Sequence, residues 1–421
     1  MISLSEQKFE AHALVRAGAI QRRLEHVADV LVGGVLVALP WSVSATEILI
    51  VLWLIALLPT LSAEAVRREV MSAAGGLPVL LWLLGVLGML WADASWSERI
   101  AGLSGFHKLL VVPLLLAQYR RWGQAQWVLL GFLGSCAVLM VVSWVLALDS
   151  DLPYRGRSSL GVPVRDYALQ STVFAICGFG LLGRAAEERG ARTMTVLLLG
   201  AALFIGNILF VATARTTLVV MVVLLVVLGV RQFGWKGALG AALAGGILAG
   251  TGWASSPYLR QRVSAAVTEV QARGAENVIT AVGLRLGYWK SSLQFIAEAP
   301  VIGHGTGTIA GLFRRDAAPD TDPMLLTDNP HNQILAVAIQ LGGIGVLVLL
   351  VMWVAHLLLF RGGGLMAWFG LVVVLQNVIG SMFNTYLFES GQGWLYIFGI
   401  GITGGVVLSR AAAPATDERR A

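Results

Sequence analysis

The sequence has few charged residues and few cysteines for its length. Only 13% of its 421 residues are Asp, Glu, Lys or Arg, whereas 57% are hydrophobic and the mean hydropathy is +0.77. A water-soluble domain of this size needs more charge to cover its surface, so that class is excluded. Cys136 and Cys177 both fall inside apolar stretches, which favours small core side chains over a disulfide or a metal pair.

Other absences narrow the function. The sequence has no P-loop, which argues against ATP as substrate, and no His/Cys cluster at metal-ligand spacing. It has no recognisable nucleic-acid module either, although its pI is about 9.6. We therefore expect no cofactor, no metal and no nucleic-acid partner. The first apolar run is followed at once by a second with no A-x-A-like site between them, which argues against a cleavable signal peptide.

Long apolar runs are what the sequence does have. Runs of roughly 17–25 apolar residues can cross a hydrocarbon core, and in lipid they must be helical. The hydropathy pattern predicts an all-α polytopic membrane protein with about twelve transmembrane helices. The expected spans lie near residues 27–40, 46–61, 77–91, 108–117, 126–148, 167–183, 193–212, 216–230, 237–254, 333–355, 365–384 and 391–408.

The basic residues predict the orientation of these spans. With the N-terminus inside, 17 of the 30 Lys and Arg fall in inner segments, so both termini are expected to be cytoplasmic. Five segments follow: a cytoplasmic amphipathic N-terminus at 1–26, nine spans over 27–254, a periplasmic loop at 255–332, three spans over 333–409, and a cytoplasmic tail at 410–421.

The long outer loop has features of folded structure. Apolar residues recur with helical spacing at positions 263, 266, 267 and 270, and again at 286, 289, 293 and 296. The second stripe runs to Pro300, which would end a helix, and Gly303–Gly307 is a turn-forming glycine cluster. We expect amphipathic helices here that lie along the membrane surface and line a cavity.

Arginines on the outer side are the first candidates for chemistry. Arg215 lies between two strongly apolar spans, where a guanidinium needs a partner or a wet cavity; snorkelling or a structural ion pair is the alternative. Arg285 shares a helical face with Tyr288 and could bind an anion or anchor headgroups. Arg155 and Arg157 could bind substrate or pair with nearby aspartates.

Two histidines, an asparagine and a glutamate complete the candidate set. His331, just before a predicted span, could be a general base or a structural residue. Asn332 could cap that span, and His304 could simply belong to the glycine turn. Glu389, in the last outer loop, could orient a substrate or a cationic side chain. Arginines with one histidine and few acids suit a phosphate or diphosphate lipid, because arginine binds phosphate in bidentate fashion.

The chain resembles the O-antigen ligase/polymerase superfamily of bacterial cell envelopes over about residues 206–393. Ala214-Arg215-Thr216 resembles its S-x-S-R signature, and the stretch from Arg285 through Trp289 to Gly307 resembles its "R…W…PlfGhGtG" block. Pro330–Leu335, followed by Gln340-Leu341-Gly342, resembles its "HN-x-[FY]-L…LG" block.

This resemblance implies an inverting, metal-independent glycosyltransferase of the inner membrane with a periplasmic active site. The donor would be a glycan on undecaprenyl diphosphate, and the O-antigen ligase, with lipid A–core as acceptor, fits best. Arg215 and Arg285 would bind the diphosphate and His331 would deprotonate the acceptor hydroxyl. Arg155, Arg157, Tyr288, His304, Asn332 and Glu389 are the further candidates for substrate binding.

Two kinds of alternative stay open. Within the superfamily, an O-antigen polymerase or a protein O-oligosaccharyltransferase would share the architecture. A lipid or polysaccharide transporter is a different class, but it predicts inverted repeats and paired broken helices, which the sequence does not clearly show.

Overall fold

The computed structural model describes residues 4–121, 123–149, 161–255, 260, 264, 281–317 and 327–412. These residues form helices and connecting turns without a β-strand, which confirms the all-α prediction. Part of the long loop lies outside the described residues, including the stripe positions 263, 266, 267 and 270. The helices are α1 (Leu4–Ala38), α2 (Val43–Leu57), η1 (Leu58–Thr60), α3 (Ala63–Val70), α4 (Ala73–Gly88), α5 (Trp96–Ser104), η2 (His107–Leu110), α6 (Val111–Arg121), α7 (Ala125–Leu148), α8 (Tyr167–Glu187), α9 (Ala191–Phe210), α10 (Arg215–Phe233), α11 (Trp235–Ser255), α13 (Ala281–Glu298), α14 (Ile309–Asp316), α15 (Gln333–Leu359), α16 (Leu365–Gly380) and α17 (Ser390–Ala412).

Fewer helices than the expected twelve meet the requirements of a membrane span. Among the described residues, seven helices are long and apolar enough to cross a membrane, and two bent pairs raise the number to nine. The expected short span at 108–117 lies in one bent pair, α5 with η2 and α6, where the axis turns by 49°. The expected last-but-one span is the 16-residue α16, which ends at Gly380 and not at Asn384.

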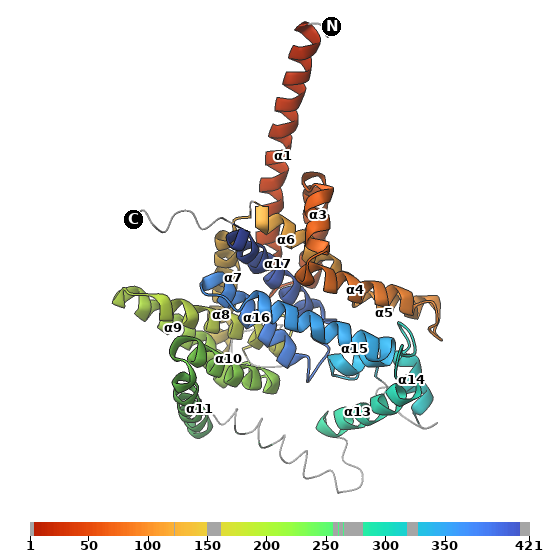
Figure 1. The fold of residues 1–421 in the computed structure, drawn as a ribbon. Helices are drawn as coiled ribbons and strands as arrows, with labels where there is room; N and C mark the ends of the chain where they lie inside the picture. Colours follow the sequence, from red (N-terminus) through yellow and green to blue (C-terminus); the bar gives the residue numbers. More distant parts are fainter. Residues whose placement is uncertain are drawn as a thin grey trace.

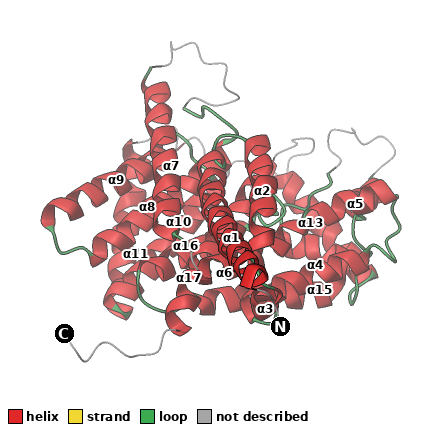
Figure 2. Cartoon of the chain, turned by 90° about the horizontal axis from the view of Figure 1, so that it is seen from above, coloured by secondary structure: helices red, strands yellow, loops and turns green. Residues whose placement is uncertain are grey.

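The expected N-terminal segment and the expected first span form a single helix. Residues 4–38 make one unbroken helix that projects from the bundle (Figure 1), so the expected boundary at residue 26 is not a break in the chain's secondary structure. Seen along α1, the other helices surround its base (Figure 2).

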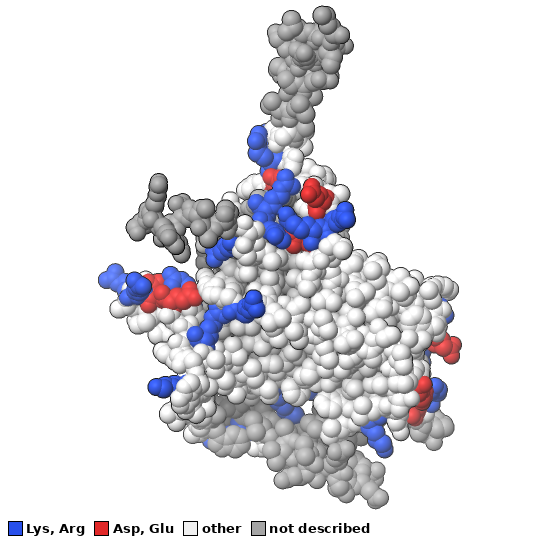
Figure 3. Space-filling view, viewed as in Figure 1, with Lys and Arg blue, Asp and Glu red and all other residues white. Residues whose placement is uncertain are grey.

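On the face drawn in Figure 3, charged side chains are sparse across the middle. Figure 3 shows a broad band of uncharged surface, with Lys and Arg gathered above it around α1 and α3 and further charges at its edges. An uncharged belt between charged ends is what a bilayer requires, because charge is costly in hydrocarbon. The chain is therefore an integral membrane protein, as its seven apolar helices also indicate.

Small residues let the central helices approach closely. A Cβ placed on Gly401 of α17 would lie 2.3 Å from the Leu115 side chain of α6, and one on Gly405 would lie 2.6 Å from Tyr119. Close packing of this kind replaces the hydrophobic driving force that helices lack in lipid. The core that results includes Trp53 of α2, whose ring centroid lies 5.7 Å from that of Phe398 in α17.

The glycine cluster after α13 is bound to a break in α15. Gly342 interrupts α15 with a φ of 62°, which frees backbone groups on both sides of the break. The segment at 300–305 satisfies them. His304 and Gly305 donate to the carbonyls of Ile339 and Gln340 at 2.8 and 2.9 Å, and Gly343 donates to Pro300 at 2.8 Å. The outer-loop helix α13 is thus tied to a transmembrane helix through main-chain bonds.

Replacement of Gly342 by alanine should therefore destabilise the protein. A φ of 62° with a ψ of −161° is a conformation essentially restricted to glycine and costs an alanine about 1–3 kcal/mol, and the new Cβ would lie 2.3 Å from the carbonyl of Val301. We expect a lower thermal midpoint in detergent for Gly342→Ala. Gly134→Ala is the matched control, because a Cβ at that position in α7 meets nothing within 4 Å. Equal midpoints for the two variants would show that the break does not hold the loop.

Candidate active site

The turn before α15 is fixed by its own side chains. The Asn329 backbone N–H donates to Thr327 Oγ1 at 3.0 Å, and that hydroxyl donates to the Asn329 carbonyl at 2.8 Å. His331 follows with a φ of 51°, a left-handed conformation that is uncommon outside glycine. Its backbone N–H donates to Asn329 Oδ1 at 2.7 Å. The turn therefore holds the histidine in one backbone conformation at the mouth of the bundle.

Asn332 starts α15. Its Oδ1 accepts the backbone N–H groups of Ile334 and Leu335 at 2.9 and 3.1 Å, and its Nδ2 donates to the Met382 carbonyl at 3.0 Å. This is the capping role that the sequence allowed. The side chain also ties the start of α15 to the turn after α16, so Asn332 supports the site by holding His331 in place.

The imidazole of His331 is half-buried between two neighbours. Its Nδ1 lies 3.0 Å from Asn384 Oδ1, and its ring stacks against Tyr288 with centroids 6.2 Å apart and planes 26° apart. Asn384 also contacts Asn329 at 3.3 Å and Glu389 at 3.5 Å. Tyr288 of α13 thus covers one face of the His331 imidazole, and Asn384 in the turn after α16 fixes its Nδ1.

The surroundings of His331 favour its neutral form. Burial lowers the pKa of His331 below its ordinary value of 6.5, and the charge of Arg285 acts in the same direction. The hydrogen bond with Asn384 and the charge of Asp328 oppose this shift but do not reverse it. At neutral pH the imidazole is therefore uncharged and able to accept a proton.

Helix α13 brings Arg285 and Tyr288 to the histidine. An aromatic cluster anchors this helix: Phe295 is almost fully buried and lies 5.3 Å from the Phe313 ring of α14, which also packs against Tyr288 at 5.7 Å. Arg285 is exposed, yet it is close enough to influence the pKa of His331. A guanidinium and a neutral imidazole thus share one site.

Arg215 is the first residue of α10. The next turn of this helix joins α8 through the hydroxyls of Thr217 and Ser171, which are 3.0 Å apart. Tyr386 links this region to α13: it is hydrogen-bonded with Thr172 of α8, and the charge of Arg285 affects its pKa. Burial raises the pKa of Tyr386 to about 12, so its hydroxyl stays protonated.

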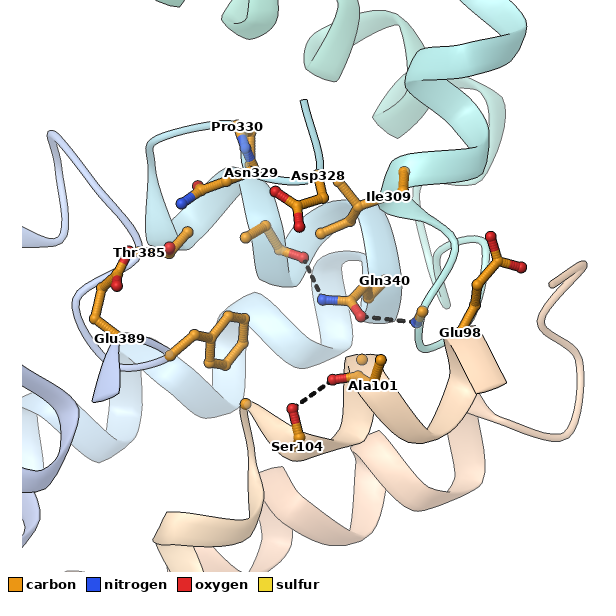
Figure 4. A pocket seen from close by; sticks show the side chains of 16 residues that line it. Glu98, Ala101, Ser104, Ile309, Asp328, Asn329, Pro330, Gln340, Thr385 and Glu389 are labelled. Atoms are coloured by element: carbon orange, nitrogen blue, oxygen red, sulfur yellow. Dashed lines mark hydrogen bonds between the residues drawn. The ribbon is translucent and has the colours of Figure 1, made fainter. Parts of the chain in front are cut away.

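A pocket of about 390 Å³ adjoins the histidine turn (Figure 4). Asp328, Asn329 and Glu389 line it together with residues of α5, α14 and α15. Burial raises the pKa of Glu389, and the charge of Lys108 opposes that shift. The Lys108 ammonium donates to the carbonyls of Phe388 and Glu389 at 2.7 and 3.1 Å. Glu389 thus lies between the pocket and Asn384.

The remaining candidates have other surroundings. The His304 ring contacts the Phe295 carbonyl at 2.8 Å and the Glu298 carboxylate at 3.9 Å, within the segment that ties α13 to α15. Arg155 and Arg157 lie outside the described residues. Among the residues that the structure describes, no group of three or more His, Cys, Asp or Glu could hold a metal ion.

Sequence reasoning missed Asn384 and the importance of Asn329. The hydropathy pattern extended the penultimate span to Asn384, whereas α16 ends at Gly380 and Asn384 lies in the turn that follows. The sequence feature that could have pointed to Asn384 is its position as a polar residue at the predicted end of a transmembrane span. Nothing in that pattern shows that the residue faces a histidine 53 positions earlier in the chain.

Residues 199–350 match the family model described as O-antigen ligase. The matched stretch contains Arg215, Arg285 and His331, while Asn384 and Glu389 lie beyond it. No curated protein matches the chain. This match supports the resemblance of the chain to the O-antigen ligase superfamily, whose members are membrane ligases and polymerases.

Proposed function

We propose that the protein is an O-antigen ligase, an inverting glycosyltransferase that needs no metal. It transfers O-antigen polysaccharide from undecaprenyl diphosphate to a sugar hydroxyl of lipid A–core. The observation that carries this proposal is the pairing of His331, held neutral at the mouth of the bundle, with the exposed guanidinium of Arg285. A base next to a phosphate-binding cation suits transfer from a lipid diphosphate.

Arg285 and Arg215 bind the diphosphate of the donor. Each guanidinium offers paired N–H donors that fit phosphate oxygens, and the charge on those oxygens increases as the bond to the sugar breaks. The two arginines therefore stabilise the departing diphosphate more than the intact donor, which is the condition for catalysis. Tyr288, on the same face of α13 as Arg285, lies beside the reacting sugar.

His331 activates the acceptor. Its imidazole takes the proton from the acceptor hydroxyl as the oxygen attacks the anomeric carbon from the face opposite the diphosphate. The new C–O bond forms while the bond from that carbon to the diphosphate oxygen breaks, so the anomeric configuration inverts. Undecaprenyl diphosphate leaves as a stabilised anion, and no general acid is required.

The course of α4 supports one orientation in the membrane. This helix begins beside α3 and the charged surface around it, where the Ala74 carbonyl contacts His356, and it ends where Gly85 accepts a bond from Thr306 in the site segment. We infer that the α3 end, rich in arginine, faces the cytoplasm. The site then faces the periplasm at the inner membrane, with both termini cytoplasmic, and the described residues 281–317 and 327–332 form part of its outer wall.

The pH dependence of transfer should reflect the lowered pKa of His331. Because the neutral imidazole is the active form, kcat should fall as the pH decreases, with the midpoint of that fall below pH 6.5. Measurement of kcat over a series of pH values, with purified protein in detergent, gives this acid limb of the pH profile, the range in which kcat falls as the pH decreases. A limb centred above pH 6.5 would contradict the lowered pKa and the assignment of His331 as the base.

The acceptor distinguishes this proposal from its alternatives. Purified protein is incubated with donor lipid alone, with donor lipid and lipid A–core, or with donor lipid and a pilin-like protein. The proposed ligase forms product only with lipid A–core. Longer glycan on the donor lipid would indicate a polymerase, and glycosylated protein would indicate a protein O-oligosaccharyltransferase.

A further inference from the structure

We propose that Asn384 is a positioning residue that fixes the tautomer of His331, so that Nδ1 carries the proton and Nε2 is free to act as the base. This inference rests on the proposed function for its role in catalysis. It comes from a closed set of hydrogen bonds among His331, Asn329 and Asn384 in which only one assignment of donors and acceptors is possible.

The assignment starts from a group whose role is not in doubt. The backbone N–H of His331 can only donate, so the Asn329 atom that it meets at 2.7 Å must be the carboxamide oxygen. The other end of the Asn329 side chain is then its NH₂ group, which can only donate. That group lies 3.3 Å from Asn384, so the atom of Asn384 that faces it must be Oδ1.

The same oxygen sets the proton on the imidazole. Asn384 Oδ1 accepts and cannot donate, and it lies 3.0 Å from His331 Nδ1. A hydrogen bond at this position therefore requires a proton on Nδ1. A neutral imidazole has only one N–H, so Nε2 has a free lone pair.

Glu389 supports this orientation from the other side of Asn384. The Asn384 NH₂ group points to Glu389 Oε1 at 3.5 Å, and an ionised carboxylate only accepts. Reversal of the Asn384 side chain would place its oxygen against that carboxylate and its NH₂ against the NH₂ of Asn329. Both contacts would be repulsive, so the carboxamide has one stable orientation.

The tautomer matters because the opposite one is inactive. A histidine with its proton on Nε2 would present a donor to the acceptor hydroxyl and could not take the proton. The bond from Asn384 selects the active form before substrate binds, as orienting partners of catalytic and metal-binding histidines do. The charged and titratable groups around the ring are Arg285 and Tyr288 on α13, Asp328 in the same turn, and Glu389 through Asn384.

Two variants of Asn384 test the inference in purified protein with donor lipid and lipid A–core. Asn384→Leu removes the acceptor and is expected to lower kcat by roughly 10–100-fold, the range found for orienting partners of histidine, with little change in KM. Asn384→Asp retains an oxygen at Nδ1 and adds negative charge. It should keep kcat at high pH within about tenfold of the original protein, and its acid limb should move to higher pH because the carboxylate stabilises the imidazolium.

A purely structural role would give a different result. Both variants would then lose activity together with thermal stability, and the pH limb would not move. A readout that does not depend on activity is the ¹⁵N spectrum of histidine-labelled protein, with His331→Ala used to assign the signal. The original protein and Asn384→Asp should show a protonated Nδ1, whereas Asn384→Leu should show a mixture of tautomers.

Failure of this inference is distinct from failure of the proposed function. The role of Asn384 alone would be overturned if the original protein transfers glycan and Asn384→Leu has the same kcat and the same ¹⁵N spectrum. Absence of transfer by the original protein to any acceptor would overturn the proposed function and the catalytic role of Asn384 together.

Discussion

Replacement of His331 by alanine is expected to reduce glycan transfer by roughly 10²–10⁴-fold, the contribution typical of a general base. The pKa of the imidazole is lowered by burial, and its Nδ1 is fixed by Asn384, which leaves Nε2 for the proton of the acceptor hydroxyl. The loss should appear in kcat, because the proton moves only in the transition state. In cells, lipopolysaccharide should lack O-antigen while the protein is present in the membrane at its normal amount.

The control for this variant is a histidine of the same chain in a different place. His26 is exposed on α1, and His26→Ala should leave transfer unchanged. His331→Ala cells that still attach O-antigen at the normal level would exclude the base. A loss of transfer that accompanies loss of the protein from the membrane would instead assign His331 to folding.

Replacement of Arg285 by alanine should have the second large effect. Removal of a cation that stabilises developing charge typically lowers kcat by about 10²–10³-fold. Arg285→Lys should restore only part of the activity, because an ammonium cannot make the paired bonds of a guanidinium. The variant should also move the acid limb to higher pH, because the charge of Arg285 lowers the pKa of His331 in the original protein.

Lys290 gives the matched control for Arg285. Both residues are exposed cations on α13, so Lys290→Ala removes the same charge from the same helix without touching His331. If Arg285 only anchors lipid headgroups, the two variants should lower kcat by the same small factor. A specific loss in Arg285→Ala, together with the shifted limb, supports its place beside the reacting groups.

The sequence predicted the helical class well because apolar runs in lipid have one solution for their backbone groups. It also predicted the helix that carries Arg285 and its end before Pro300, since both depend on local spacing. Of the twelve expected spans, the described helices support seven, or nine if each bent pair is one span. Hydropathy does not show that α5 and α6 form a bent pair, or that α16 ends at Gly380, because packing and turn geometry determine these features.

The sequence predicts candidate residues for a site, but it does not predict how they are arranged. His331, Arg285, Tyr288 and Glu389 do lie together, but the contacts that position them are long-range. The glycine turn is stable because α15 breaks at Gly342 and offers matching backbone groups, a fit between segments about 40 positions apart. Local periodicity contains no information on such pairing.

The most direct test of the central claim is a mass balance in proteoliposomes that contain the purified protein, donor lipid and lipid A–core. The ligase mechanism predicts that glycan-bearing lipid A–core and free undecaprenyl diphosphate appear in equal amounts, and that His331→Ala forms neither. Movement of intact donor lipid across the bilayer, with no new glycosidic bond and no release of undecaprenyl diphosphate, would contradict the mechanism and identify a transporter.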